Sequence, residues 1–179
     1  ACECSGTVRD AFRLKGHDAW SCDILPSDTP SEYHIQSDVR PILEDNWDLI
    51  ICFPPCTYLS SSGARWFYHP DDGHLPTNER RPHPKYPDRR SQQQEAIDFF
   101  MLFASSKIAK VAIENPIGVM STKFRKPDQI IEPFMFGDEA SKKTCLWLKG
   151  LPKLVPTKLV SKGEFQVLAS GKKIATWYS

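Results

Sequence analysis

Residues 48–60 read DLIICFPPCTYLS, and this stretch decides how the rest of the chain is interpreted. The apolar run 48–52 predicts a buried parallel strand, and the proline pair 54–55 marks its end at the edge of a sheet. Open α/β sheets bind ligands just beyond the carboxyl ends of their strands. Cys56 would therefore be presented where a substrate lies, which makes it the candidate nucleophile. The alternative is a small buried apolar residue, the usual place of a free cysteine.

Length and composition indicate one soluble globular domain over residues 1–179. Hydrophobic residues make up 40% of the chain and charged residues 25%. No apolar run approaches the roughly 20 residues of a membrane span, and there is no signal-like segment. The six cysteines contain no CxxC pair. We therefore expect reduced thiols in a cytoplasmic protein, with no metal site and no membrane partner.

Charge is unevenly distributed along the chain. Residues 1–120 hold 12 Lys and Arg against 17 Asp and Glu, whereas residues 121–179 hold 11 against 5. A basic C-terminal part suits a polyanionic partner. A solvated lysine-rich surface explains the same counts nearly as well.

The N-terminal part predicts a strand end, a turn and a helix, followed by two strands that end in acids. The turn at residues 5–7 consists of small residues, which let the backbone approach a ligand. Residues 18–26 predict a strand ending near Asp23, and residues 35–39 a shorter one with Asp38. In dinucleotide-type folds an acid at the place of Asp23 takes ribose hydroxyls, and Asp38 suits the amine of an adenine. Solvated loop carboxylates are the alternative.

Residues 61–90 differ in kind from the rest of the chain. They hold five of the 15 prolines, four Trp, Phe and Tyr residues, and six Lys and Arg residues. This composition predicts a long loop without regular structure, and such a loop in a compact domain is usually functional or mobile. Aromatic rings mixed with arginines suit base stacking and phosphate contact. A flexible insertion without function is the competing interpretation.

A second acid follows another predicted strand. Residues 91–94 open a helix with a capping-box pattern, and Ala, Phe, Phe and Phe at 96, 99, 100 and 103 form its apolar stripe. The helix leads to a buried strand at 109–113, which is followed by Glu114, Asn115 and a proline. Parallel strands end at one edge, so Glu114 would face Cys56 as a proton donor beside a nucleophile. A buried or capping glutamate is the alternative. This order of elements predicts an α/β fold with a doubly wound, mostly parallel sheet.

Together these residues resemble the DNA (cytosine-5) methyltransferases, particularly the short forms of phage and prophage genomes. In that family the nucleophile lies in a Pro-Cys motif, here 55–56, and the acid in a Glu-Asn motif, here 114–115. The resemblance implies a Rossmann-like fold that binds S-adenosylmethionine. The chain departs from the family pattern in three respects. Its first motif has a single glycine, Pro116 follows the Glu-Asn pair, and a separate target-recognition domain is lacking.

The resemblance also implies which residues form the site. The implied catalytic residues are Cys56, Glu114, Asn115 and Lys143. The implied contacts to S-adenosylmethionine are Glu3, Cys4, Ser5, Gly6, Thr7, Val8, Asp23, Ile24, Asp38, Val39, Pro54 and Pro55. The contacts expected with DNA are Arg65, Arg80, Arg81, Arg89, Arg90 and Lys142.

The family mechanism agrees with the chemistry of these residues. The Cys56 thiolate would add to carbon 6 of cytosine while Glu114 donates to ring nitrogen 3. Carbon 5 would then take the methyl group, and loss of its proton would expel the thiolate. A base inside a duplex must be flipped out or already unpaired to react in this way. Two alternatives remain: the same chemistry on a free pyrimidine nucleotide or RNA, and a non-catalytic regulatory protein that binds the cofactor or DNA.

Overall fold

The computed structural model describes residues 1–167, 171 and 173–176. The described strands form a two-stranded parallel sheet, a four-stranded mixed sheet and a two-stranded antiparallel sheet. The first contains β1 (Ser21–Asp23) and β2 (His34–Gln36). The second has the order β3-β4-β6-β5 and contains β3 (Leu49–Cys52), β4 (Lys110–Pro116), β5 (Gln129–Ile131) and β6 (Thr144–Lys149). The third contains β7 (Phe165–Val167) and β8 (Lys173–Ala175).

The expectation of a doubly wound, mostly parallel, Rossmann-like sheet is wrong. β3 and β4 are parallel, but β6 runs antiparallel to both β4 and β5, and β1 and β2 belong to a separate sheet. A parallel neighbour requires a long crossover connection, usually a helix. Between β4 and β6 the chain forms only the short helix α4 (Met120–Lys123), β5 and the 3-10 helix η3 (Pro133–Met135). It therefore returns to the sheet in the antiparallel direction.

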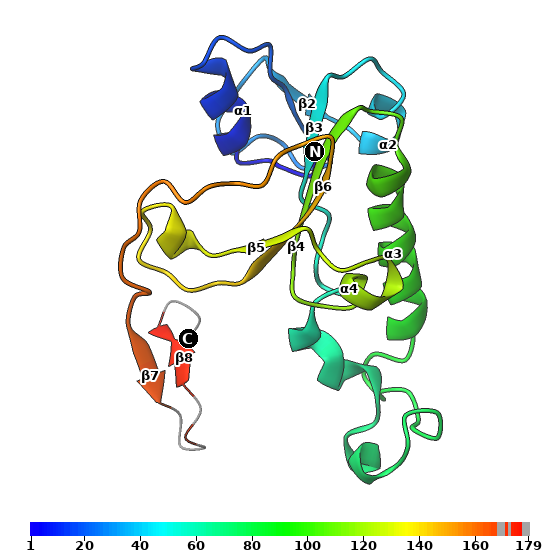
Figure 1. Ribbon diagram of the computed structural model, residues 1–179. Coiled ribbons are helices and arrows are strands. Elements are labelled where there is room, and N and C mark those ends of the chain that lie inside the picture. Colours follow the sequence, from blue (N-terminus) through cyan, green and yellow to red (C-terminus); the bar gives the residue numbers. More distant parts are fainter. Residues whose placement is uncertain (168–170, 172, 177–179) are drawn as a thin grey trace.

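The long helix lies along one side of the four-stranded sheet (Figure 1). This helix, α3 (Arg89–Ser105), starts two residues before the predicted position, and the predicted capping box does not form. The residue before the helix, Asp88, makes no side-chain cap, and its carbonyl instead accepts from the Ser91 hydroxyl at 2.8 Å. The shorter helices α1 (Thr7–Arg13) and α2 (Val39–Ile42) precede β1 and β3.

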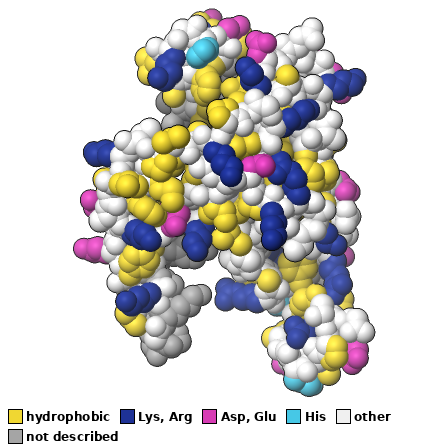
Figure 2. Space-filling model, in the orientation of Figure 1, with side chains coloured by type: hydrophobic (Ala, Val, Ile, Leu, Met, Phe, Trp, Pro, Cys, Tyr) yellow, Lys and Arg dark blue, Asp and Glu magenta, His cyan; other side chains and the backbone are white. Residues whose placement is uncertain are grey.

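Residues 61–90 project beyond the end of α3 as a separate protrusion, here called the 61–90 lobe (Figures 1 and 2). The predicted irregular loop instead contains the 3-10 helices η1 (Ser61–Phe67) and η2 (Pro70–His74). The C-terminal strands β7 and β8 form a second projection from the same end of the molecule. Within the described part of the chain, no helix is both long and apolar enough to cross a membrane.

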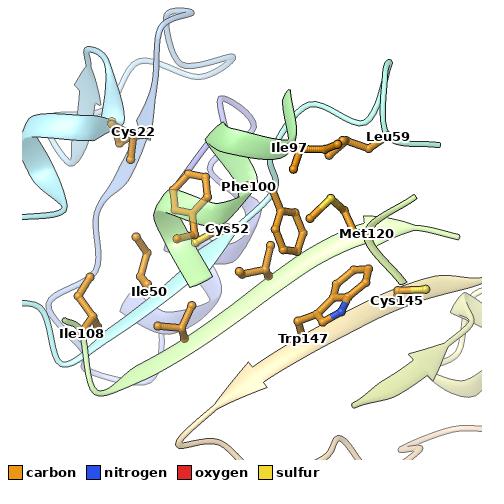
Figure 3. Packing of buried hydrophobic residues seen from close by; sticks show 14 residues of the cluster. Cys22, Ile50, Cys52, Leu59, Ile97, Phe100, Ile108, Met120, Cys145 and Trp147 are labelled. Carbon is orange, nitrogen blue, oxygen red and sulfur yellow. The ribbon is translucent and has the colours of Figure 1, made fainter. Parts of the chain in front are cut away.

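The hydrophobic core lies between α3 and the four-stranded sheet (Figure 3). Phe100 and Phe103 of the predicted stripe are fully buried, and the Phe100 ring packs edge-on against Trp147 of β6 at a centroid distance of 5.2 Å. Each such side chain contributes about 1.5–3 kcal/mol by burial. Ile97 is also buried, although the predicted stripe did not include it.

Residues 1–3 connect the β1–β2 sheet to the four-stranded sheet. The Ala1 nitrogen donates to the Ile51 carbonyl at 2.6 Å, and the Phe53 nitrogen donates to the Ala1 carbonyl at 3.0 Å, a pattern of parallel pairing. The Glu3 nitrogen donates to the Cys22 carbonyl of β1 at 3.3 Å. The ends of β1 and β3 are thereby held at a common edge. Behind this bridge lies a cavity of about 550 Å³ whose lining includes Val8, Phe12, Val39, Trp47 and Ile50.

Candidate functional site

Cys56 lies on a tight turn just beyond the carboxyl end of β3. Its carbonyl accepts hydrogen bonds from the Leu59 nitrogen at 3.0 Å and the Ser60 nitrogen at 2.9 Å, which closes one helical turn. We call residues 56–60 the Cys56 turn. The Cys56 side chain is exposed. It is therefore not the buried packing residue that the sequence left open as an alternative.

The ends of β3 and β4 are tied together immediately before this turn. The two strands are parallel, with Cys52 opposite Ile113, so Glu114 is the next residue along β4. The side chain of Asn115 is fully buried, and its Nδ2 donates to the Pro54 carbonyl at 2.7 Å. The Glu-Asn pair of one strand therefore fixes the Pro-Cys segment of the other.

The environment of Glu114 favours its protonated form. Burial raises the pKa of this carboxyl, and the positive charge of Lys142 lowers it in part. Lys142, which was expected to contact DNA, is thus the lysine that interacts with Glu114. Both Lys142 and Lys143 are exposed. Glu114 also adds to the effect of burial in raising the pKa of the Cys145 thiol.

The segment after β4 packs closely against the Cys56 turn. The Val119 nitrogen donates to the Leu59 carbonyl at 2.9 Å, and the Ser61 nitrogen donates to the Ile117 carbonyl at 3.1 Å. A Cβ atom at Gly118 would lie 1.9 Å from the Leu59 carbonyl oxygen. The sequence analysis did not identify Gly118, although a glycine just past a strand end is a signal of close backbone approach.

The first turns of α3 contact the Cys56 turn from another side. Nη2 of Arg89 donates to the Thr57 carbonyl at 2.9 Å, and Nε2 of Gln93 donates to the Tyr58 carbonyl at 2.8 Å. Arg89 was expected to contact DNA, but its side chain is buried inside the protein. Gln93 is a residue of the site that sequence reasoning missed, because nothing in a helix-forming glutamine signals its partner.

Internal contacts hold the 61–90 lobe in shape. Arg81 donates through Nη2 to Asp72 at 2.6 Å and through its backbone nitrogen at 2.8 Å, and this holds the pKa of the Asp72 carboxyl well below its usual range. Arg80 donates to the carbonyls of Gly73 and Leu75 at 3.0 and 2.7 Å. Two of the arginines expected to bind DNA therefore stabilise the lobe itself.

Arg65 and Arg90 remain directed toward solvent. Both are exposed and lie over aromatic rings, Arg65 over Trp66 at 4.6 Å and Arg90 over Tyr68 at 4.9 Å. Lys and Arg side chains recur across the face of the molecule seen in Figure 2. Of the predicted DNA contacts, Arg65, Arg81, Arg90 and Lys142 are therefore exposed, whereas Arg89 is buried.

The predicted cofactor turn is ordered by its own side chains. Oε1 of Glu3 accepts from the Ser5 hydroxyl at 2.6 Å and from the Val8 nitrogen at 3.3 Å. Gly6 has φ +74°, and a Cβ there would meet the Arg9 guanidinium at 2.3 Å. Arg9 is buried and donates to the Ser21 hydroxyl at 3.0 Å. Cys4 is half-buried and Thr7 exposed on this turn.

The predicted acids gather near residues 1–3. Asp23 closes β1 and accepts from the Leu25 nitrogen at 3.0 Å, and Asp38 caps α2 by accepting from the Arg40 nitrogen at 2.8 Å. Burial raises the pKa of the Cys2 thiol to about 11, and the charges of Asp23 and Asp38 add to this effect.

The other predicted cofactor residues differ in their exposure to solvent. Ile24 is exposed and Val39 is buried in the core. Pro54 is buried beneath the Cys56 turn, whereas Pro55 is exposed. Within the described ranges, no three His, Cys, Asp or Glu side chains are grouped so as to hold a metal ion.

Comparison with models of protein families, with curated proteins and with solved structures finds no match to this chain.

Proposed function

We propose that this chain transfers a methyl group from S-adenosylmethionine to carbon 5 of cytosine in DNA. The observation that carries the proposal is the 2.7 Å bond from Asn115 to the Pro54 carbonyl. This bond joins the segment that precedes the exposed Cys56 to the strand that contains the half-buried Glu114, and burial raises the pKa of the Glu114 carboxyl. A thiol nucleophile and a carboxyl that can donate a proton are the groups that addition to an aromatic pyrimidine requires.

Each residue has a definite part in the proposed reaction. The sulfur of Cys56, as thiolate, forms a bond to carbon 6 of cytosine, while Glu114 gives its proton to ring nitrogen 3. The resulting electron-rich carbon 5 accepts the methyl group that bound S-adenosylmethionine supplies. A base then removes the carbon 5 proton, the bond between sulfur and carbon 6 breaks, and the thiolate of Cys56 returns. Nitrogen 3 gives its proton back in the same step.

The chemistry of the acids near residues 1–3 fits this cofactor. Carboxylates accept hydrogen bonds from ribose hydroxyls and from amines, and their negative charge suits a sulfonium cation. Glu3, Asp23 and Asp38 would provide these acceptors. Because residues 1–3 bond to both β1 and β3, the same bridge would place the cofactor beside the Pro-Cys segment.

The proposed partner is a cytosine that is flipped out of a duplex or lies in a single strand. Arg65 and Arg90 of the 61–90 lobe and Lys142 beside Glu114 are exposed cations that could contact phosphates. A cytoplasmic location is part of the proposal, since all six cysteines are free thiols.

Covalent trapping on DNA that contains 5-fluorocytosine tests the proposal. Fluorine at carbon 5 blocks the final elimination, so intact-mass analysis with S-adenosylmethionine should show protein joined to DNA. Cys56→Ala should abolish the adduct, whereas Cys22→Ala, at a buried free cysteine with no part in the proposed reaction, should retain it. No adduct on duplex or single-stranded DNA would contradict the proposal. Adducts on 5-fluorocytosine RNA or nucleotide alone would transfer the chemistry to those substrates.

A further inference from the structure

We infer that Arg89 is a positioning residue, which fixes the Cys56 turn by binding the carbonyl of Thr57 while lying buried between two rings. The inference rests on the proposed role of Cys56 as the nucleophile. The Thr57 carbonyl accepts from Nη2 of Arg89 at 2.9 Å, directly beside the reactive residue. A hydrogen bond from a charged donor is roughly twice as strong as one from a neutral donor.

The surroundings of Arg89 fix the direction of its guanidinium. Its central carbon lies 5.0 Å from the centre of the Tyr58 ring and 5.1 Å from that of Phe67. Gly63 leaves room for this packing, because a Cβ there would come within 2.5 Å of Nη2. The side chain is 93% buried, since its exposed fraction is 7%. A flat cation between two aromatic faces has little freedom to rotate.

Packing stability alone does not account for this arrangement. Among the described ion pairs none includes Arg89, and its Nε is buried without a hydrogen-bond partner. Burying a guanidinium without a carboxylate costs free energy. What this buried cation provides instead is a rigid donor aimed at the turn that carries the thiol.

Arg89 also connects two parts of the molecule. It is the first residue of α3 and the last but one of the 61–90 lobe, and it packs on Phe67 of that lobe. Gln93, one turn later, binds the Tyr58 carbonyl at 2.8 Å. Arg89 therefore contacts both the lobe and the Cys56 turn, so a change in the lobe around Phe67 is expected to affect the turn.

Amide hydrogen exchange tests the inference without requiring methyl transfer. The amides of Leu59 and Ser60, which donate to the Cys56 carbonyl, report on the closed turn. Arg89→Lys and Gly63→Ala should each raise their exchange about tenfold or more, because the charged bond to Thr57 is weakened. Exchange at Ile113 of β4 should stay unchanged, which separates opening of the turn from global unfolding.

Two matched controls accompany these variants. Arg90→Lys alters the neighbouring exposed arginine, and Gly73→Ala adds a methyl group where no atom lies within 4 Å. Neither should change exchange at Leu59 or Ser60. If Arg89→Lys and Gly63→Ala match these controls, the inference is overturned.

Trapping kinetics with 5-fluorocytosine DNA separate positioning from DNA contact. A positioning role predicts that Arg89→Lys slows adduct formation at saturating DNA about tenfold with little change in the DNA concentration for half-maximal rate. A rise in that concentration with an unchanged maximal rate would instead make Arg89 a DNA contact and overturn the inference. If the wild type forms no adduct but Arg89→Lys and Gly63→Ala still raise exchange at Leu59 and Ser60, the proposed function is contradicted. The inference that Arg89 positions the Cys56 turn would then still hold.

Discussion

At the scale of single residues, the adjacent residues Glu114 and Asn115 of β4 make different contacts. Glu114 and Asn115 point to opposite faces of the strand, as successive residues do. Asn115 faces the α3 side, where it is fully buried and binds the Pro54 carbonyl. Glu114 faces the other side, where it is half-buried and interacts with Lys142. Asn115 thus holds the Pro54 segment in place, and Glu114 is the residue that donates a proton in the proposed reaction.

Replacement of Glu114 by glutamine should slow covalent trapping but raise the stability of the folded protein at neutral pH. Loss of a general acid is expected to slow trapping of 5-fluorocytosine about 10²–10⁴-fold. Because burial raises the pKa of Glu114, the folded state binds its proton more tightly than the unfolded state does. The Glu114 carboxyl therefore lowers stability as pH rises above its unfolded pKa of about 4.3.

Urea denaturation over a range of pH checks the second part of this prediction. Glu114→Gln should match the wild type at about pH 3.5, where both side chains are neutral, and should be the more stable protein at about pH 7. Glu95→Gln, on the exposed surface of α3, controls for the loss of one charge. Equal stability of Glu114→Gln and wild type at all pH values would refute the assignment of a raised pKa.

At the scale of elements, the Cys56 turn is held by three structures that meet around it. β4 contributes Asn115, α3 contributes Arg89 and Gln93, and the segment after β4 contributes the backbone around Gly118. None of these structures is local to the turn in sequence. Tertiary contacts therefore hold the turn, in addition to the two prolines at 54–55 that precede it.

Gly118→Ala should disturb this junction more than any other added methyl group near the turn. The new Cβ would lie 1.9 Å from the Leu59 carbonyl oxygen, so the backbone must move apart. Overpacking of this kind costs about 1–3 kcal/mol in the free energy of unfolding. Thermal unfolding measures this cost, and the same variant should form the fluorocytosine adduct more slowly. Gly73→Ala, in open space, should behave as the wild type.

Local sequence patterns predicted individual elements better than their assembly. The apolar runs before Cys56 and Glu114 did become β3 and β4, and the two strands are parallel. The direction of β6 could not be read in the same way, because an apolar strand such as 144–149 has the same pattern whether it pairs parallel or antiparallel. Within the described residues, the chain between β4 and β6 contains no long crossover helix. The sequence pattern alone did not reveal this.

In the candidate site, too, the sequence indicated some residues and not their contacts. Cys56, Glu114 and Asn115 carry a chemical signal in the sequence, namely a presented thiol and an acid after parallel strands. Nothing in the sequence indicated the internal partners of Arg80, Arg81 and Arg89; Arg89 is buried by its contacts, whereas the Arg81 side chain stays 63% exposed. Asp72 and the Thr57 carbonyl are those partners for Arg81 and Arg89.

At the scale of the whole molecule, Asp23 of the proposed cofactor site and the proposed nucleophile Cys56 follow strands of different sheets. Asp23 ends β1 of the two-stranded sheet, whereas Cys56 follows β3 of the four-stranded sheet. Residues 1–3 bond to both, next to the cavity of about 550 Å³. The 61–90 lobe and the β7–β8 hairpin then extend beyond the sheets from one end (Figure 1).

The salt dependence of DNA binding should identify the cations that contact DNA. Each phosphate contact contributes a slope of about −0.9 to the plot of log binding constant against log salt concentration. Arg65→Ala and Arg90→Ala should each reduce the steepness by about that amount. Lys107→Ala, at the opposite end of α3 from Arg90 and 94% exposed, is the control. Unchanged slopes in both arginine variants would exclude the exposed face of the 61–90 lobe from the DNA contact.

The separation in sequence of the contacts around Cys56 bears on the kinetics of folding. Asn115 and Pro54 are 61 residues apart, and Arg89 and Thr57 are 32 apart. Contacts between distant residues form slowly, because the intervening chain must first close into a loop. α3, whose hydrogen bonds are local, can form before them. The thiol of Cys56 should thus reach its final position only in the last stage of folding, when β3 and β4 have paired and the sheet is complete.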